Sequence, residues 1–112
     1  MLAIARKGRK QMLYRMRRRH IKTGRKFYSI STVLYRRGEL GDAIRFRSIA
    51  AQLGYARAMY VMGCHYEFGD GVDEDRVKAN AWYARAMAAG LDMVRIDLKG
   101  SYLRERKRLS RA

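Results

Sequence analysis

The chain has 112 residues, no proline, one cysteine and a formal net charge of +16 at pH 7. A chain of this length forms one small domain that buries roughly 60–70% of the surface its unfolded form exposes. The absence of proline and the many Ala, Arg, Leu and Met residues predict an all-helical fold. Cys64 has no internal disulfide partner, and no apolar run approaches the roughly 20 residues that span a bilayer. We therefore expect a reducing compartment, the cytoplasm, and no membrane partner.

The positive charge is concentrated at the two ends of the chain. Residues 1–38 contain thirteen Lys or Arg residues and no Asp or Glu, whereas residues 39–100 contain eight basic and nine acidic residues. Residues 101–112 contain five basic residues and one acid, Glu105. The middle of the chain is therefore nearly neutral, and an acidic or polyanionic partner would be attracted to its ends.

The first 26 residues predict a basic arm. Met12, Leu13 and Met16 share one helical face among arginines, which indicates a helix from about residue 9 to 22 that Gly24 ends. Three interpretations are open: an arm that binds an acidic partner or polyanion, a helix that covers the first repeat, and a mitochondrial presequence. The first two are compatible, and the absence of Ser and Thr before Thr23 disfavours the third.

The segment after the arm predicts a helical hairpin. Apolar residues from Phe27 to Leu34 indicate a short helix that closes at Gly38. After a tight turn, Asp42 is a candidate N-cap for a second helix that runs through Leu53.

A second hairpin follows, with a turn rich in Gly and Asp. Ahead of the turn, three residues recur every four positions on one helical face: Ala58, Met62 and Tyr66. After it, small and aromatic residues follow i, i+3, i+4, i+7 spacing: Ala79, Trp82, Tyr83, Ala86 and Gly90. In the turn, Gly69 and Gly71 can adopt positive φ without steric cost, and Asp73 and Asp75 are candidate N-caps. The aromatic residues are expected at the interface between the helices.

The order of these residues resembles the Sel-one-like repeat, a relative of the tetratricopeptide repeat. The matching residues are Ala58, Met62 with Gly63, Tyr66, Gly69, Gly71 with Val72, Asp75, Lys78 with Ala79, Trp82 with Tyr83, Ala86 and Gly90. Met62 replaces the usual Leu, and Arg85 and Met87 replace a Lys and an Ala. The resemblance covers about a third of the chain. It implies a right-handed αα-solenoid that presents a concave helical face to another protein.

An offset of 36 residues relates this unit to both of its neighbours. Four residues of the first hairpin correspond to Ala79, Trp82, Ala86 and Gly90, namely Ala43, Phe46, Ala50 and Gly54. Arg47 departs from the pattern, because it stands where the repeat has a Tyr. In the other direction, Leu98 and Tyr102 correspond to Met62 and Tyr66, with Val94 in place of Ala58. Residues 92–109 therefore resemble the opening helix of a third repeat.

Together these patterns predict an all-α fold, a short αα-solenoid of about two and a half helical-hairpin repeats with a basic N-terminal helix. Residues 1–26 form the arm, and residues 27–112 form the repeat domain, which ends in a basic capping helix. Because at least about three repeats are usually needed for independent stability, we expect the arm or a partner to contribute.

The sequence predicts no enzyme, cofactor or metal site. The acidic turn from Asp70 to Asp75 does not match the twelve-residue calcium loop of an EF-hand. Zinc needs three or four ligands at workable spacing, and Cys64, His65 and His20, the only other histidine, do not supply them. A Cys64–His65 nucleophile pair is disfavoured, because sequence neighbours on a helix point about 100° apart. Cys64 is therefore expected to be a small packing residue.

The expected function is a non-enzymatic interaction module, that is, an adaptor, an assembly subunit or a small inhibitor that binds an acidic protein surface. The alternative is an RNA- or DNA-binding or ribonucleoprotein subunit whose arm contacts phosphates. A membrane-surface role ranks below both, because the apolar face of the arm is narrow. The candidate contact residues are Arg6, Lys7, Arg9, Lys10, Arg15, Arg17, Arg18, Arg19, Lys22, Arg25 and Lys26 in the arm and Arg104, Arg106, Lys107, Arg108 and Arg111 at the C-terminus. For nucleic acid, the candidate stacking residues are Tyr14, Phe27, Tyr28 and Tyr35, of which Phe27 and Tyr35 are equally plausible as core residues.

Overall fold

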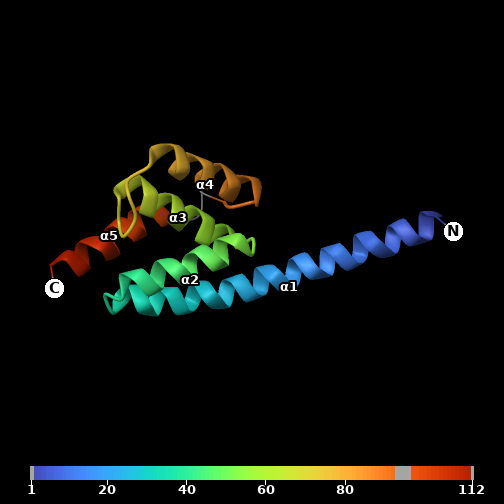
Figure 1. Ribbon diagram of the computed structural model, residues 1–112, viewed down its shortest axis with the longest axis horizontal. Coiled ribbons are helices and arrows are strands. Elements are labelled where there is room, and N and C mark those ends of the chain that lie inside the picture. The colour runs from blue at the N-terminus through green and yellow to red at the C-terminus, as the bar shows by residue number, and fades with distance from the viewer. Residues whose placement is uncertain (1, 93–96, 112) are drawn as a thin grey trace.

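The computed structural model describes residues 2–92 and 97–111, with side chains from Lys7 onward, and it is all-α (Figure 1). Within those residues the helices are α1 (Leu2–Arg36), α2 (Leu40–Gln52), α3 (Ala56–Phe68), α4 (Arg76–Ala88) and α5 (Leu98–Ser110). Helices α1 and α2 form one hairpin, α3 and α4 form the next, and α2 packs on α3. The predicted fold class, a short αα-solenoid, is confirmed.

The two hairpins repeat the same packing at the predicted offset. Ala43 and Ala79 are each 0% exposed, and so are Ala50 and Ala86, about two turns further along their helices. Phe46 and Trp82 are both half-buried at equivalent positions. The glycines that follow α2 and α4 both adopt positive φ, 96° at Gly54 and 90° at Gly90. Small buried residues at this spacing allow the helices of each hairpin to approach closely.

Helix α1 continues through the predicted boundary between arm and repeat. The prediction that Gly24 ends a helix is wrong, because Gly24 lies inside α1 and is buried. A Cβ on Gly24 would lie 3.0 Å from the Ala50 carbonyl oxygen and 3.1 Å from Tyr55 Cβ. This glycine therefore allows the end of α2 to approach α1, and α1 ends only before Gly38, where φ is 78°.

Helix α3 forms the centre of the fold. Eight consecutive residues, Ala58 to His65, are buried because α2, α4 and α5 pack around this helix. The turn after it has the predicted form, with Gly69 at φ 60° and Gly71 at φ 75°. The Asp75 side chain caps α4 by accepting a hydrogen bond from the Lys78 backbone N–H at 3.0 Å.

The predictions that Asp42 and Asp73 cap helices are wrong, and it is Asp75 that caps α4. Helix α2 begins at Leu40 with Glu39 in the cap position, so Asp42 lies in the first turn. A carboxylate there remains favourable, because it faces the positive end of the helix dipole.

Gly63 is the position where α3 and α4 touch. A Cβ on Gly63 would lie 2.5 Å from Tyr83 Cε1 and 3.1 Å from the Ala79 carbonyl oxygen. We expect Gly63→Ala to lower the free energy of unfolding by about 2 kcal/mol in urea denaturation, because the helices must separate. Gly41→Ala in α2 is the control: a Cβ there meets nothing within 4 Å, so stability should be unchanged or rise by up to about 1 kcal/mol. Equal losses in the two variants would contradict the close approach.

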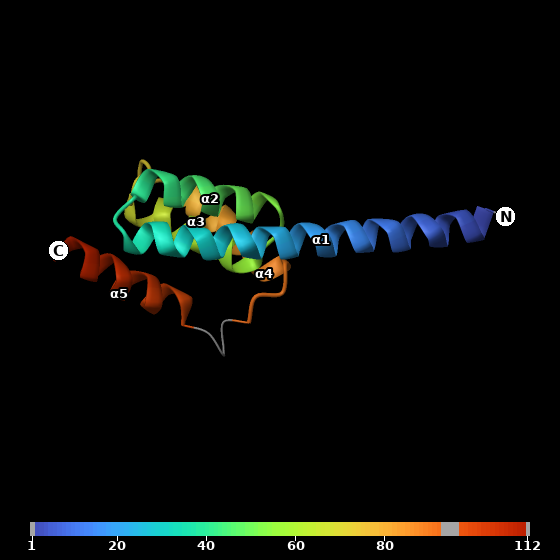
Figure 2. The same ribbon diagram turned by 90° about the horizontal axis from the view of Figure 1, so that it is seen from below.

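Helix α5 lies where the third repeat was expected to open. It packs against α3, and Tyr102 is buried at the position that corresponds to Tyr66. It also lies beside the C-terminal end of α1 (Figure 2). There the Arg36 Nε lies 3.0 Å from Glu105 Oε1. The helix begins at Leu98, and the proposed counterpart of Ala58, Val94, lies outside the described residues.

Candidate interaction surface

The N-terminal part of α1 projects from the helical body. Figures 1 and 2 show it extending alone beyond the other helices. A helix of 35 residues is about 52 Å long at 1.5 Å per residue, and the molecule measures 63 × 27 × 24 Å. Every residue from Lys7 to Thr23 is exposed, whereas Gly24 is buried against α2. The predicted arm is therefore the free end of a long helix whose other end belongs to the first repeat.

The arm presents uncompensated positive charge. Its predicted contact residues from Lys7 to Lys26 are all exposed, and in the described part of the chain none of them forms an ion pair; the Arg6 side chain lies outside that part. The first turn of α1 contains no acid. Positive charge near a helix N-terminus opposes the helix dipole, and Arg15 repels Arg19 across one turn. An acidic partner would relieve both effects.

The same arm also exposes apolar side chains. Met12, Leu13, Tyr14 and Met16 are 57%, 62%, 62% and 45% exposed. The Arg18 guanidinium lies 5.8 Å from the centre of the Tyr14 ring. This part of α1 therefore exposes an apolar surface, formed by four large residues within five positions, as well as a cationic one.

The C-terminal basic residues are differently placed and partly neutralised. Arg104 Nη1 lies 3.7 Å from Asp97 Oδ2, and Arg108 Nη1 lies 3.7 Å from Glu105 Oε2. Arg106 is half-buried over the Phe68 ring and donates to the Phe68 carbonyl oxygen at 3.4 Å, so it holds α5 to α3. The remaining two, Lys107 and Arg111, are exposed. The two basic clusters lie at opposite ends of the molecule, so they do not form one site (Figure 1).

Three of the four candidate stacking aromatics belong to the body. Tyr35 is buried at 2% exposure, Phe27 stacks on Phe46 with ring centres 5.7 Å apart, and Tyr28 lies 5.4 Å from the Tyr55 ring. Of the four candidates, Tyr14 alone is an exposed residue of the arm.

A buried polar network lies beneath the C-terminal helix, centred on Arg47. This side chain is 4% exposed and lies over the rings of Tyr28 and Tyr35, 5.8 Å and 4.4 Å from their centres. Its Nε donates to Ser31 Oγ at 3.1 Å, and its Nη1 lies 3.0 Å from His65 Nε2. Sequence reasoning missed this network, although Arg47 was visible as a departure from the repeat at a position where the repeat has a Tyr.

His65 links Arg47 to the turn after α3. Because Nε2 accepts from the arginine, Nδ1 carries the proton and donates to the Asp70 carbonyl oxygen at 2.9 Å. Burial, and then the Arg47 charge, lower the pKa of His65 to about 4. The Asp70 carboxylate lies 3.6 Å from Nδ1, but at pH 7 the ring is neutral and the contact is no ion pair.

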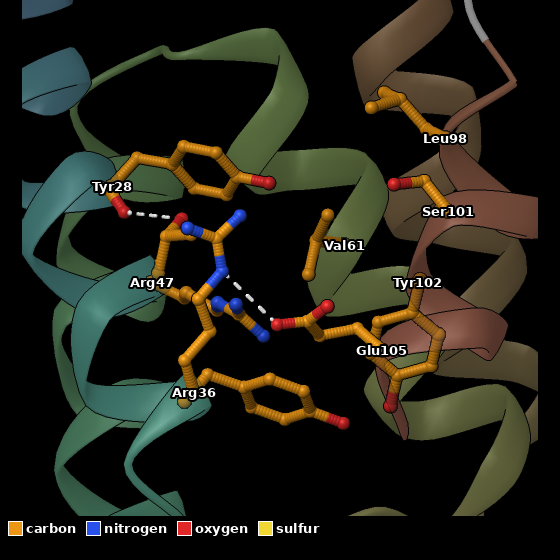
Figure 3. A pocket seen from close by; sticks show the side chains of 10 residues that line it. Tyr28, Arg36, Arg47, Val61, Leu98, Ser101, Tyr102 and Glu105 are labelled. Atoms are coloured by element: carbon orange, nitrogen blue, oxygen red, sulfur yellow. Dashed lines mark hydrogen bonds and ion pairs between the residues drawn. The ribbon is translucent and has the colours of Figure 1, made fainter. Parts of the chain in front are cut away.

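The Asp70 carboxylate connects the network to two helices. It accepts hydrogen bonds from the Tyr35 hydroxyl of α1 at 2.8 Å and from the Tyr102 hydroxyl of α5. Burial and these bonds raise the pKa of both tyrosines, so both stay protonated donors. A small pocket of about 90 Å³ lies beside the network and is lined by residues of α1, α2, α3 and α5 (Figure 3). The network therefore joins α1, α2, α3 and α5 into one body.

Cys64 is a packing residue in the structure. It is fully buried, and burial raises the pKa of its thiol to about 11, so the nucleophilic thiolate is scarce at neutral pH. Within residues 7–92 and 97–111, no three His, Cys, Asp or Glu side chains are grouped so that they could hold a metal ion. In the same residues, none of the helices combines the length and apolar character that crossing a membrane requires.

These features define an all-helical, solenoid-like protein with a projecting cationic helix. Compared with protein-family models, with curated protein sequences and with solved structures, the chain matches none.

Proposed function

We propose that the protein is a non-enzymatic interaction module that binds an acidic partner protein through its projecting helix. The observation that carries the proposal is the arm itself, a helix with exposed cations, no carboxylates and a row of exposed apolar residues. The resemblance to Sel-one-like repeats supports it, because that family binds proteins. On this view the solenoid is a rigid support, and the arm makes the contact.

The apolar residues favour a protein over a nucleic acid as the partner. Phosphates are bound by cations and polar groups, and the exposed Leu13 and Met16 side chains offer them neither. A protein surface can pair carboxylates with the arginines and bury the apolar residues in the same contact. Arginine suits this role, because its planar fork binds carboxylates with two parallel hydrogen bonds.

Binding to RNA or DNA is the second candidate function. The observation in its favour is Tyr14, which is exposed among the arginines and can stack on an unpaired base. Such binding would depend steeply on salt, because each neutralised phosphate releases counterions.

A pair of charge variants tests the proposal. The arm variant changes Arg15, Arg17, Arg18 and Arg19 to Gln, and its matched control changes Arg104, Lys107, Arg108 and Arg111 to Gln. Each removes four positive charges from exposed positions. We expect the arm variant to lose at least about tenfold in affinity for soluble polyglutamate at 150 mM salt, and the control to lose about threefold or less.

The competing function is measured with the same proteins. A single-stranded oligonucleotide of matched charge is titrated beside the polyglutamate. If the oligonucleotide binds at least about tenfold more tightly than polyglutamate and the arm variant abolishes that preference, the protein-binding proposal is wrong. Unchanged melting temperatures would confirm that the variants remain folded, as expected for exposed residues.

A further inference from the structure

Leu13 and Met16 on the arm continue the face of α1 that packs on α2. In the body, Gly24 meets the end of α2, Phe27 stacks on Phe46, and Ser31 receives the Arg47 hydrogen bond. These residues follow each other at intervals of three and four, which defines one helical face. The same intervals lead backwards along α1 to His20, Met16 and Leu13. The arm therefore carries a helix-packing face beyond the point where its partner helix ends.

A groove lies along this face. It has a volume of about 600 Å³ and is lined by arm residues that include Leu13 and Met16 and by Gln52, Leu53 and Gly54 at the end of α2. Lys10 and Arg17 also line it, so cations border the apolar floor. Among the residues that the structure describes, no Asp or Glu lines the groove, so its charged lining is entirely positive.

We infer that this groove docks an acidic amphipathic helix of the partner protein, lying end to end with α2 along the arm. The inference rests on the proposed function and names the kind of surface that the arm recognises. The partner helix buries its apolar face on Leu13 and Met16 and pairs its carboxylates with Lys10 and Arg17. From Gly24 back to Leu13 the arm extends about 16 Å, which is room for roughly three turns of a partner helix.

The electrostatics of the arm favour a partner helix of this kind. The two cations that line the groove, Lys10 and Arg17, lie seven residues apart, which is about two helical turns. Carboxylates repeated at the same spacing along an adjacent helix can pair with both cations together. An acidic helix therefore neutralises the whole cationic border of the groove, which an isolated carboxylate cannot do.

Two synthetic peptides of about 18 residues, each about 27 Å long as a helix, test the inference. Both contain only Glu, Leu and Ala in equal proportions. In one the leucines form a single helical face, and in the other they are distributed around the helix. Fluorescence anisotropy titrations at 150 mM salt should show that the intact protein binds the one-faced peptide at least about tenfold more tightly.

Three residues of the arm provide matched variants. Leu13→Gln combined with Met16→Gln removes the apolar floor and keeps every charge, so it should reduce binding of the one-faced peptide about tenfold, to the level of the other peptide. Met12→Gln is the control, because Met12 is 57% exposed on the same arm but does not line the groove. It should change the affinity by about twofold or less.

The outcomes separate the inference from the proposed function. If both peptides bind equally, or if Met12→Gln weakens binding as much as the groove variant, the docked helix is wrong while acidic recognition stands. If neither peptide binds and the oligonucleotide does, both are wrong.

Discussion

Replacing Arg47 by Met should lower the free energy of unfolding by about 3–5 kcal/mol, measured by guanidinium denaturation. Methionine fills much of the same volume but supplies no donor. Ser31 Oγ loses its 3.1 Å bond from Nε but keeps its own bond to the Tyr28 carbonyl oxygen, whereas His65 Nε2 loses its 3.0 Å contact with Nη1 and is left without a donor. A buried polar group left without a partner costs about 1–3 kcal/mol. The rings of Tyr28 and Tyr35 also lose a desolvated cation.

The matched control for this substitution is Arg45→Met. Arg45 lies two positions earlier in the same helix and is exposed, so its replacement should change stability by no more than about 0.5 kcal/mol. If Arg47→Met lowered stability by less than about 1 kcal/mol, the network would be incidental to the fold.

The repeat pattern predicted the helical framework because it depends on local rules. Pairs of small residues 36 positions apart, such as Ala43 and Ala79, are buried in equivalent places. Gly69 and Asp75 have the conformations that their turn and cap positions require. Such residues act on the backbone around them, so a linear sequence reveals their role.

The meaning of Gly24 could not be found by the same rules. A glycine after a helical pattern usually marks a C-cap, yet here it is a contact point between α1 and α2. The difference depends on what lies across from it, namely the Ala50 carbonyl and the Tyr55 side chain, both far along the chain. Close approach is a tertiary property, and spacing alone does not show it.

Arg47 illustrates the same limit for polar residues. In the sequence it is a departure from an aromatic position, with no indication of a partner. Its hydrogen-bonding partners come from α1 and α3, and the aspartate that completes the network follows α3. Only the stacking of the two hairpins brings these partners together. The sequence therefore shows that Arg47 is charged, but it does not show where its side chain lies or what it binds.

The sequence predicted which basic residues the candidate surface contains, but not the geometry in which they are arranged. The concentration of cations before Lys26 is evident from the sequence. That these cations project on a helix with Leu13 and Met16 facing a groove depends on α1 continuing past the end of α2. The predicted break at Gly24 would have detached the arm, whereas the continuous helix gives it a fixed direction.

Lowering the pH should destabilise the fold between pH 6.5 and about 4 through His65. The pKa of this buried imidazole falls from an ordinary 6.5 to about 4 because burial and Arg47 disfavour its charged form. Between those values the unfolded chain binds a proton that the folded chain does not, so stability rises with pH. The contribution is fully present above pH 6.5 and amounts to roughly 3 kcal/mol.

Denaturant unfolding at several pH values between 4 and 7 measures this contribution, and the two histidines provide the comparison. His65→Gln removes the titrating group, so the dependence of stability on pH should flatten in this range. His20→Gln should leave the dependence as it is, because His20 is exposed on the arm. Burial raises the pKa of Glu67, but its hydrogen bonds to Tyr83 and Lys99 lower it by more. This carboxylate therefore loses its contribution only below its ordinary pKa of 4.5, at the acid end of the measured range. A slope that survives in His65→Gln would show that another group controls the acid sensitivity of the fold.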